Sequence, residues 1–133
     1  MPGEFELISR HFKTPLRQTE LGVGDDAALI VPRPGMRLAV STDMLVSGTH
    51  FLAETDPFLI GWKTAAVNIS DLAAMAAEPR WITLALSLPS ADEAWVAALA
   101  KGFHACCETF GLDWIGGDTT RGPLNLCATV FGE

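Results

Sequence analysis

The chain alternates between apolar runs of strand length and segments rich in glycine, proline and polar residues. Short apolar runs bounded by such turn residues are typical of β-strands. The turn Pro32-Arg33-Pro34-Gly35 separates two of these runs, so we expect them to form a hairpin or neighbouring strands. The predicted strands are residues 27–31, 36–42, 81–88, 112–115 and 124–131.

Three helices are predicted from apolar residues that recur every three or four positions. They cover residues 4–12, residues 57–77, and a segment that begins after Ser90 or Asp92 and ends at Gly111. Strands and helices follow each other in a mixed order rather than in strict alternation. We therefore expect an α+β fold in which helices cover a mixed or antiparallel sheet of about four strands.

Composition narrows the class of protein. At 133 residues, with 49% hydrophobic and 19% charged residues, the chain fits one folded domain. A net charge of -7 with scattered Lys and Arg argues against a nucleic-acid partner. No apolar run approaches the roughly 20 residues of a membrane span, the N-terminus does not resemble a signal peptide, and three cysteines suggest no disulfide framework. We expect a cytoplasmic protein with no membrane partner.

Acidic residues at the ends of apolar runs carry the candidate chemistry. Asp43 follows Ser41 and Thr42 after one run, Asp118 follows two glycines after another, and Asp71 lies in an Ala-rich helical segment. Each aspartate alone has an ordinary alternative, as a turn former or a solvated residue. Together they predict a cation site, because neighbouring, partly buried carboxylates repel one another without a cation. Magnesium is the natural candidate because it prefers oxygen ligands.

Other polar residues leave alternatives open. Asp25 and Asp26 follow Gly24 and are either turn residues or members of the same acidic site. His50 is a ligand, a substrate contact or a solvent-facing histidine, and Arg121 meets either a phosphate or solvent. The sequence contains no P-loop, no complete dinucleotide-binding fingerprint and no GxSxG nucleophile elbow. The chemistry therefore depends on the carboxylates.

Five short motifs carry a family resemblance. They are Gly22-Val23-Gly24-Asp25-Asp26-Ala27-Ala28, Ser41-Thr42-Asp43, Gly48-Thr49-His50-Phe51, Asn68-Ile69-Ser70-Asp71-Leu72-Ala73-Ala74-Met75 and Gly116-Gly117-Asp118-Thr119-Thr120-Arg121-Gly122. In this order and spacing they resemble the N-terminal half of the thiamine-monophosphate kinase family. The resemblance implies an ATP-dependent superfamily that includes aminoimidazole ribonucleotide synthetase, selenophosphate synthetase and a hydrogenase maturation protein. It also implies N-terminal sheets that pair into a barrel across a homodimer.

The same resemblance implies that ATP phosphorylates thiamine monophosphate to thiamine diphosphate with magnesium. It places ATP at Gly117 and Asp118, and thiamine phosphate at His50. It needs no catalytic side chain, because the second pKa of a phosphate monoester is about 6 and the acceptor is already largely anionic at neutral pH. The implied magnesium ligands are Asp26, Ser41, Thr42, Asp43, Asp71 and Asp118.

Members of this family are longer than the present chain and have a C-terminal domain with further ATP, metal and thiamine contacts. We therefore expect residues 1–133 to be the N-terminal metal- and ATP-binding and dimerisation domain of a longer enzyme, with negligible activity alone. Two alternatives stay open. One is another ATP-dependent synthetase of the same superfamily, and the other is a non-catalytic metal-binding dimerisation module.

Overall fold

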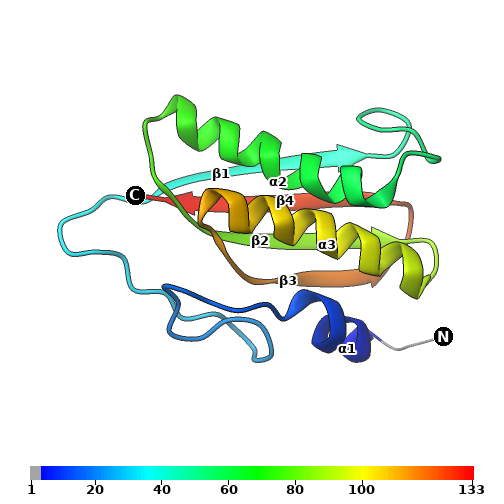
Figure 1. Ribbon diagram of the computed structural model, residues 1–133, viewed down its shortest axis with the longest axis horizontal. Coiled ribbons are helices and arrows are strands. Elements are labelled where there is room, and N and C mark those ends of the chain that lie inside the picture. The colour runs from blue at the N-terminus through cyan, green and yellow to red at the C-terminus, as the bar shows by residue number, and fades with distance from the viewer. Residues whose placement is uncertain (1–3) are drawn as a thin grey trace.

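A computed structural model describes residues 4–133 and shows a four-stranded sheet with two long helices on one face (Figure 1). The strand order is β1-β4-β2-β3; β2 and β3 are parallel, and the other neighbours are antiparallel. The predicted α+β class with a mixed sheet of about four strands is thus confirmed. The strands are β1 (Ala39–Val46), β2 (Pro79–Leu88), β3 (Asp113–Arg121) and β4 (Asn125–Gly132).

The first long helix, α2 (Pro57–Ala74), begins where its sequence provides a cap. The carboxylate of Asp56 accepts a hydrogen bond from the backbone N–H of Phe58 at 3.0 Å. This bond satisfies one of the free donors in the first helical turn. The helix ends three residues before the predicted boundary at Ala77. Its end is marked by Ala76, whose φ of 55° is left-handed and cannot continue a right-handed helix.

The second long helix, α3 (Glu93–Phe110), has local signals at both ends. Asp92 caps its start by accepting from the backbone N–H of Trp95 at 3.2 Å. Gly111 follows its end with a φ of 77°, a conformation that glycine adopts without a steric penalty. Both predicted boundaries are therefore confirmed.

The helices α2 and α3 cross with their backbones in contact. A Cβ atom added to Gly61 would lie 2.0 Å from the carbonyl oxygen of Leu99. One added to Gly102 would lie 1.9 Å from the carbonyl oxygen of Phe58. Glycine is thus required at both positions, and the close crossing packs the two helices as one layer over the sheet.

The core lies between this helical layer and the sheet, and it extends to the N-terminal helix. That helix runs as α1 (Glu4–Leu7) and continues as a π-helical turn, η1 (Ile8–Phe12), which confirms the prediction for residues 4–12. Phe12 packs against Trp114 of β3, with 4.9 Å between ring centroids. The side chain of Phe5, part of the predicted apolar stripe, lies outside the described part of the structure.

The strand predicted at residues 27–31 is wrong, and so is its predicted pairing with residues 36–42 as a hairpin or as neighbouring strands. Within that segment only Leu29 forms a β-bridge, and its partner is Leu21. The segment runs beside β3 and then passes the end of the sheet to reach β1 at the opposite edge (Figure 1). Because Pro32 and Pro34 lack a backbone N–H, they cannot donate ladder hydrogen bonds.

Two strands extend farther than predicted. β1 continues through Asp43 to Val46, where a loop was expected from residue 44. β3 continues through Gly116 to Arg121, where a loop was also expected. In both cases a neighbouring strand satisfies the backbone groups, since Asp43 pairs with Ala128 and the β3 residues pair with β2. Tertiary pairing overrides the low strand preference of Asp and Gly.

The face of the sheet opposite α2 and α3 is not covered by a helix in the described part of the chain (Figure 1). On edge strand β1, Val40 is 57% exposed and Met44 is 55% exposed, and both lie on this open face. Among the described helices, none combines the length and the apolar character needed to cross a bilayer.

Candidate active site

Three predicted site residues meet at the β1 edge of the sheet, and we call Ser41, Asp43 and Asp71 the β1-edge cluster. Alternation along β1 places Ser41 and Asp43 on the same side as the buried Leu45, which faces the helices. Asp71, in the last turns of α2, reaches this side. The hydroxyl of Ser41 donates a hydrogen bond to the Asp71 carboxylate at 3.3 Å.

The two carboxyl groups of the cluster are coupled electrostatically. A hydrogen bond with Asp71 raises the pKa of Asp43 above its ordinary value, and burial and the charge of Asp71 act in the same direction. The positive charge of protonated His50 opposes them by lowering this pKa. A pair of carboxyl groups that favours sharing a proton also favours a cation in its place. The cluster therefore has the electrostatic character of a cation site.

His50 lies in the loop that follows β1, and its ring orientation is fixed. Its Nδ1 atom accepts a hydrogen bond from the backbone N–H of Val46 at 2.9 Å. In the neutral ring the proton must then be on Nε2, which is left as a donor. Lys63 of α2 donates from Nζ to the backbone carbonyl of His50 at 2.6 Å. The loop thus presents an N–H donor near Asp43, and Lys63 of α2 holds the loop backbone in place.

Thr42 lies between Ser41 and Asp43 in sequence but projects from the opposite face of the sheet. Its hydroxyl forms a hydrogen bond with that of Thr129 on β4, at 2.9 Å. The structure therefore separates the Thr42 side chain from the β1-edge cluster. Any contribution of Thr42 to a cation beside Asp43 would come from its backbone.

The other predicted residues lie at the β3 edge. A cavity of about 400 Å³ separates the glycine-rich loop, residues 22–28, from residues 114–119 of β3. Asp26 and Asp118 line opposite walls of this cavity, and Gly117 lies beside Asp118. Gly117 has a φ of 151°, and an added Cβ atom would lie 1.7 Å from the carbonyl oxygen of Leu84. Its glycine is thus required by the packing of β3 against β2.

The fold divides the predicted site between two edges of the sheet. β1 and β3 are the outer strands of four, so about 14 Å, three strand spacings, separates them. Asp26 and Asp118 are therefore not brought to Asp43 and Asp71 within one chain. Among residues 4–133, no three His, Cys, Asp or Glu side chains are close enough to hold one metal ion. One chain therefore holds two separate groups of candidate residues, which we call the half-sites.

Two residues near the half-sites were not predicted as functional. Lys63 precedes Asp71 by eight positions on α2, so helical spacing was a usable signal for a shared face. Asp113 begins β3 and is buried at 1% exposure. In the sequence, the only feature that could have drawn attention to Asp113 was its position as an acidic residue next to an apolar run. Arg121, whose role was left open, is exposed at the far end of β3 and lines a separate cavity of about 460 Å³.

The β1-edge cluster has a donor set that suits magnesium. It offers two carboxylates and a hydroxyl, all oxygen ligands, and no sulfur or imidazole ligand. Magnesium commonly binds through one or two carboxylates and completes its shell with water and substrate phosphates. Burial and the charge of Asp71 help to raise the pKa of Asp43, and a bound cation would offset both effects.

Comparison with known proteins identifies the class. Residues 24–133 match the family model for the AIR synthase related protein, N-terminal domain. This match includes the glycine-rich loop from Gly24 onward, both half-sites and every strand of the sheet. The chain therefore belongs to the AIR synthase related family, as its sequence motifs implied.

Within this family the chain is similar to thiamine-monophosphate kinases. It is 47% identical to the Escherichia coli K12 thiamine-monophosphate kinase over 133 residues, which is 98% of this chain and 41% of that protein. The crystal structure of thiamine-monophosphate kinase from Stenotrophomonas maltophilia K279a superposes with a TM-score of 0.82 and 52% identity, over 96% of this chain and 40% of that one.

A third similar protein has a solved structure that contains bound ligands. The structure of AaThiL complexed with AMPPCP and TMP has a TM-score of 0.72 and 27% identity, over 98% of this chain and 41% of that one. That protein therefore holds an ATP analogue together with TMP. The present chain spans about two fifths of the length of the relatives it matches.

Proposed function

We propose that this chain is the N-terminal, ATP- and magnesium-binding part of a thiamine-monophosphate kinase, which converts ATP and thiamine monophosphate into ADP and thiamine diphosphate. The main support is the 47% identity that extends over 98% of the chain, with all five motifs at the two half-sites. The grouping of Ser41, Asp43 and Asp71 adds separate support, because their oxygen atoms are ligands that suit magnesium.

The residues of the chain suit a phosphoryl transfer without a general base. The acceptor is a phosphate whose second pKa is about 6, so its oxygen needs no proton removed at neutral pH. Asp43 and Asp71 would hold magnesium together with Ser41, the backbone of Thr42 and the substrate phosphates; Asp26 and Asp118 complete the proposed ligands. When bound, magnesium supplies charge screening between two anionic reactants.

The polar groups beside the carboxylates have proposed roles in binding. The free Nε2–H of His50 donates to the phosphate of thiamine monophosphate, and its orientation is set by the Val46 bond at 2.9 Å. Gly117 and Asp118 contact ATP in the cavity of about 400 Å³. Neither group exchanges a proton with the reacting atoms, so their contribution is to orient the two phosphates for in-line transfer.

We also propose that the active unit is a homodimer. Within residues 4–133, the outer edges of β1 and β3 are unpaired, and Val40 and Met44 expose apolar surface on the face of the sheet opposite α2 and α3. Pairing β1 of one copy with β3 of a second closes the two sheets into an eight-stranded barrel that buries this face. The same pairing places the β1-edge cluster of one copy one strand spacing from β3 of the other, which joins the two half-sites.

The decisive experiment is a kinase assay of the full-length protein with ATP and magnesium. We expect phosphorylation of thiamine monophosphate, and no turnover of aminoimidazole or selenide substrates. Residues 1–133 alone should bind magnesium nucleotide weakly and turn over negligibly. Turnover of an aminoimidazole or selenide substrate instead would support another synthetase of the superfamily.

Asp43→Asn and Asp71→Asn in the same full-length protein distinguish an enzyme from a non-catalytic module. Each substitution removes a carboxylate charge from the β1-edge cluster, so binding of magnesium nucleotide and kinase activity should both be lost. Glu54→Gln, which removes the same charge from an exposed loop residue, is the matched control and should leave both unchanged. Unaltered nucleotide binding in both Asp variants would contradict the proposed site.

A further inference from the structure

The buried carboxylate of Asp113 gathers three donors from a distant segment of the chain. Oδ1 accepts from the backbone N–H of Arg17 at 2.9 Å, and Oδ2 accepts from that of Gln18 at 2.8 Å. The Arg17 N–H also lies 3.1 Å from Oδ2, and the hydroxyl of Thr19 donates to the same oxygen. A carboxylate that is 1% exposed needs such partners, because an unpaired buried charge is strongly unfavourable.

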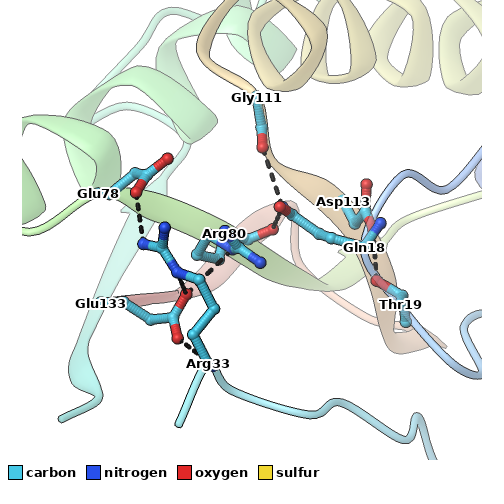
Figure 2. A network of polar contacts seen from close by, with 8 residues as sticks. All are labelled: Gln18, Thr19, Arg33, Glu78, Arg80, Gly111, Asp113 and Glu133. Atoms are coloured by element: carbon cyan, nitrogen blue, oxygen red, sulfur yellow. Dashed lines mark hydrogen bonds and ion pairs between the residues drawn. The ribbon is translucent and has the colours of Figure 1, made fainter. Parts of the chain in front are cut away.

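A second attachment holds the same three residues against the sheet. The side-chain amide of Gln18 donates to the carbonyl oxygen of Arg80 at 2.5 Å and to that of Gly111 at 3.0 Å. Figure 2 shows Gln18 and Thr19 directed at the start of β3, with Arg80 of β2 on the other side of Gln18. Residues 17–19 are therefore fixed to the beginnings of two strands.

The glycine-rich loop, residues 22–28, starts three residues after this attachment. Residues 24–27 are exposed, and the loop is closed at its base by the Leu21–Leu29 backbone pair, with N···O distances of 3.1 and 2.8 Å. Inside the loop, the Asp25 carboxylate accepts from the backbone N–H of Asp26 at 2.8 Å. These bonds shape the loop but do not position it against β3. That position depends on residues 17–19.

The two segments that line the cavity of about 400 Å³, β3 and the glycine-rich loop, are thus both connected to the side chain of Asp113. One wall runs from Asp113 along β3 to Gly117 and Asp118, and the other runs from the Asp113-bound residues into the loop. We propose that Asp113 is a positioning residue: it sets the separation between the loop and the Gly117–Asp118 backbone, and thereby the fit of the nucleotide. This inference rests on the proposed function only in taking that ligand to be ATP.

The test compares Asp113→Asn with the wild type in the full-length protein. Asn keeps the size of the side chain but replaces one acceptor oxygen with a donor NH₂ that opposes the N–H donors of residues 17 and 18. We expect faster backbone hydrogen exchange at residues 17–28 without ligand. We also expect KM for ATP to rise about tenfold, the loss of one hydrogen bond to a charged group, with kcat and KM for thiamine monophosphate nearly unchanged.

Two further variants separate positioning from general instability. Thr19→Val removes one of the donors and leaves Asp113 in place. It should produce smaller increases in hydrogen exchange at residues 17–28 and in KM for ATP. It replaces Asp113→Asn in the test if that variant does not fold. Asp92→Ala removes the side-chain cap of α3, far from the loop in sequence, and is the control. It should lower stability without changing exchange at residues 17–28 or KM for ATP.

The outcomes are distinct. Unchanged exchange at residues 17–28 in Asp113→Asn, or equal rises in KM for both substrates, would overturn the positioning role. Absence of kinase activity in the wild-type protein would refute the proposed function instead. In that case the exchange measurement, which needs no substrate, still decides whether Asp113 fixes the loop.

Discussion

Among single residues, Asp43 and Asp71 of the β1-edge cluster are two neighbouring carboxyl groups whose negative charges a cation would balance. Asp43 and Asp71 share a hydrogen bond that raises the pKa of Asp43. In the folded protein Asp43 therefore holds its proton to a higher pH than in the unfolded chain. The stability gained from the protonated pair is present at low pH and is lost as pH rises through the raised pKa. At neutral pH without a cation the pair is destabilising.

Asp71→Asn should therefore stabilise the metal-free protein while it removes the cation site. Near neutral pH we expect the melting temperature to rise by about 2–5 °C, since the repulsion is worth less than about 1 kcal/mol at a partly exposed site. At acidic pH, where protonation of Asp43 removes the repulsion, the gain should shrink. Thermal unfolding at both pH values, with and without magnesium nucleotide, measures this; magnesium nucleotide should stabilise only the wild type.

Glu54→Gln is the control, because it removes one negative charge outside the cluster. It should change the melting temperature by a similar small amount at both pH values. A lower melting temperature for Asp71→Asn near neutral pH without magnesium would show that the two carboxyl groups do not repel each other.

At the scale of elements, two glycines determine how the helical layer is built. Gly61 and Gly102 let α2 and α3 touch through their backbones. The crossing holds α2 in the position from which Asp71 reaches β1 and Lys63 reaches the His50 loop. A helix at greater distance would separate these side chains from the sheet edge. The packing of two helices thus positions one half-site.

Gly61→Ala should destabilise the protein by about 1–3 kcal/mol, because the new methyl group would lie 2.0 Å from the Leu99 carbonyl oxygen and must force the helices apart. The loss exceeds the gain of about 1 kcal/mol in helix propensity. Denaturant unfolding measures the change. Gly116→Ala, where an added Cβ atom meets no atom within 4 Å, is the control and should cost less. Equal effects of the two substitutions would contradict the proposed role of the crossing.

For the molecule as a whole, residues 4–133 cover one face of the sheet with helices and leave the other without one. Its outer strands, β1 and β3, each carry half of the predicted site. The layer of α2 and α3 lies over the other face (Figure 1), so it cannot shield Val40 and Met44. A second copy would cover this face and join the half-sites, which is the assembly proposed above.

The double variant Val40→Lys with Met44→Glu should shift the protein from dimer to monomer. Burying these two side chains should contribute about 2–4 kcal/mol, so their loss weakens association by at least about 30-fold. Sedimentation equilibrium over a concentration series measures this. Met75→Lys, which alters a 73% exposed side chain near the end of α2, is the control and should leave the dimer intact. A monomeric wild-type protein at high concentration would refute the proposed dimer.

Features that depend on neighbouring residues could be predicted from the sequence. Asp56, Asp92 and Gly111 marked helix ends correctly, because caps act within one turn of the chain. The apolar runs of β2 and β4 were found at nearly their observed bounds, since each is flanked by turn residues. The site residues were also chosen from the sequence, and their roles as ligands stay predictions.

Which of these residues meet depends on the folded arrangement of the strands. Asp43 pairs with Ala128, and Asp118 pairs with Ala85, so each lies inside a strand and not in the loop that its local sequence favours. The strand order then places them at opposite edges of the sheet. Strand pairing joins residues far apart in the chain, and its hydrogen bonds form between backbone groups whatever the side chains are. For that reason the sequence predicted one acidic site, whereas the fold of a single chain places the same residues in two separate groups, one at β1 and one at β3.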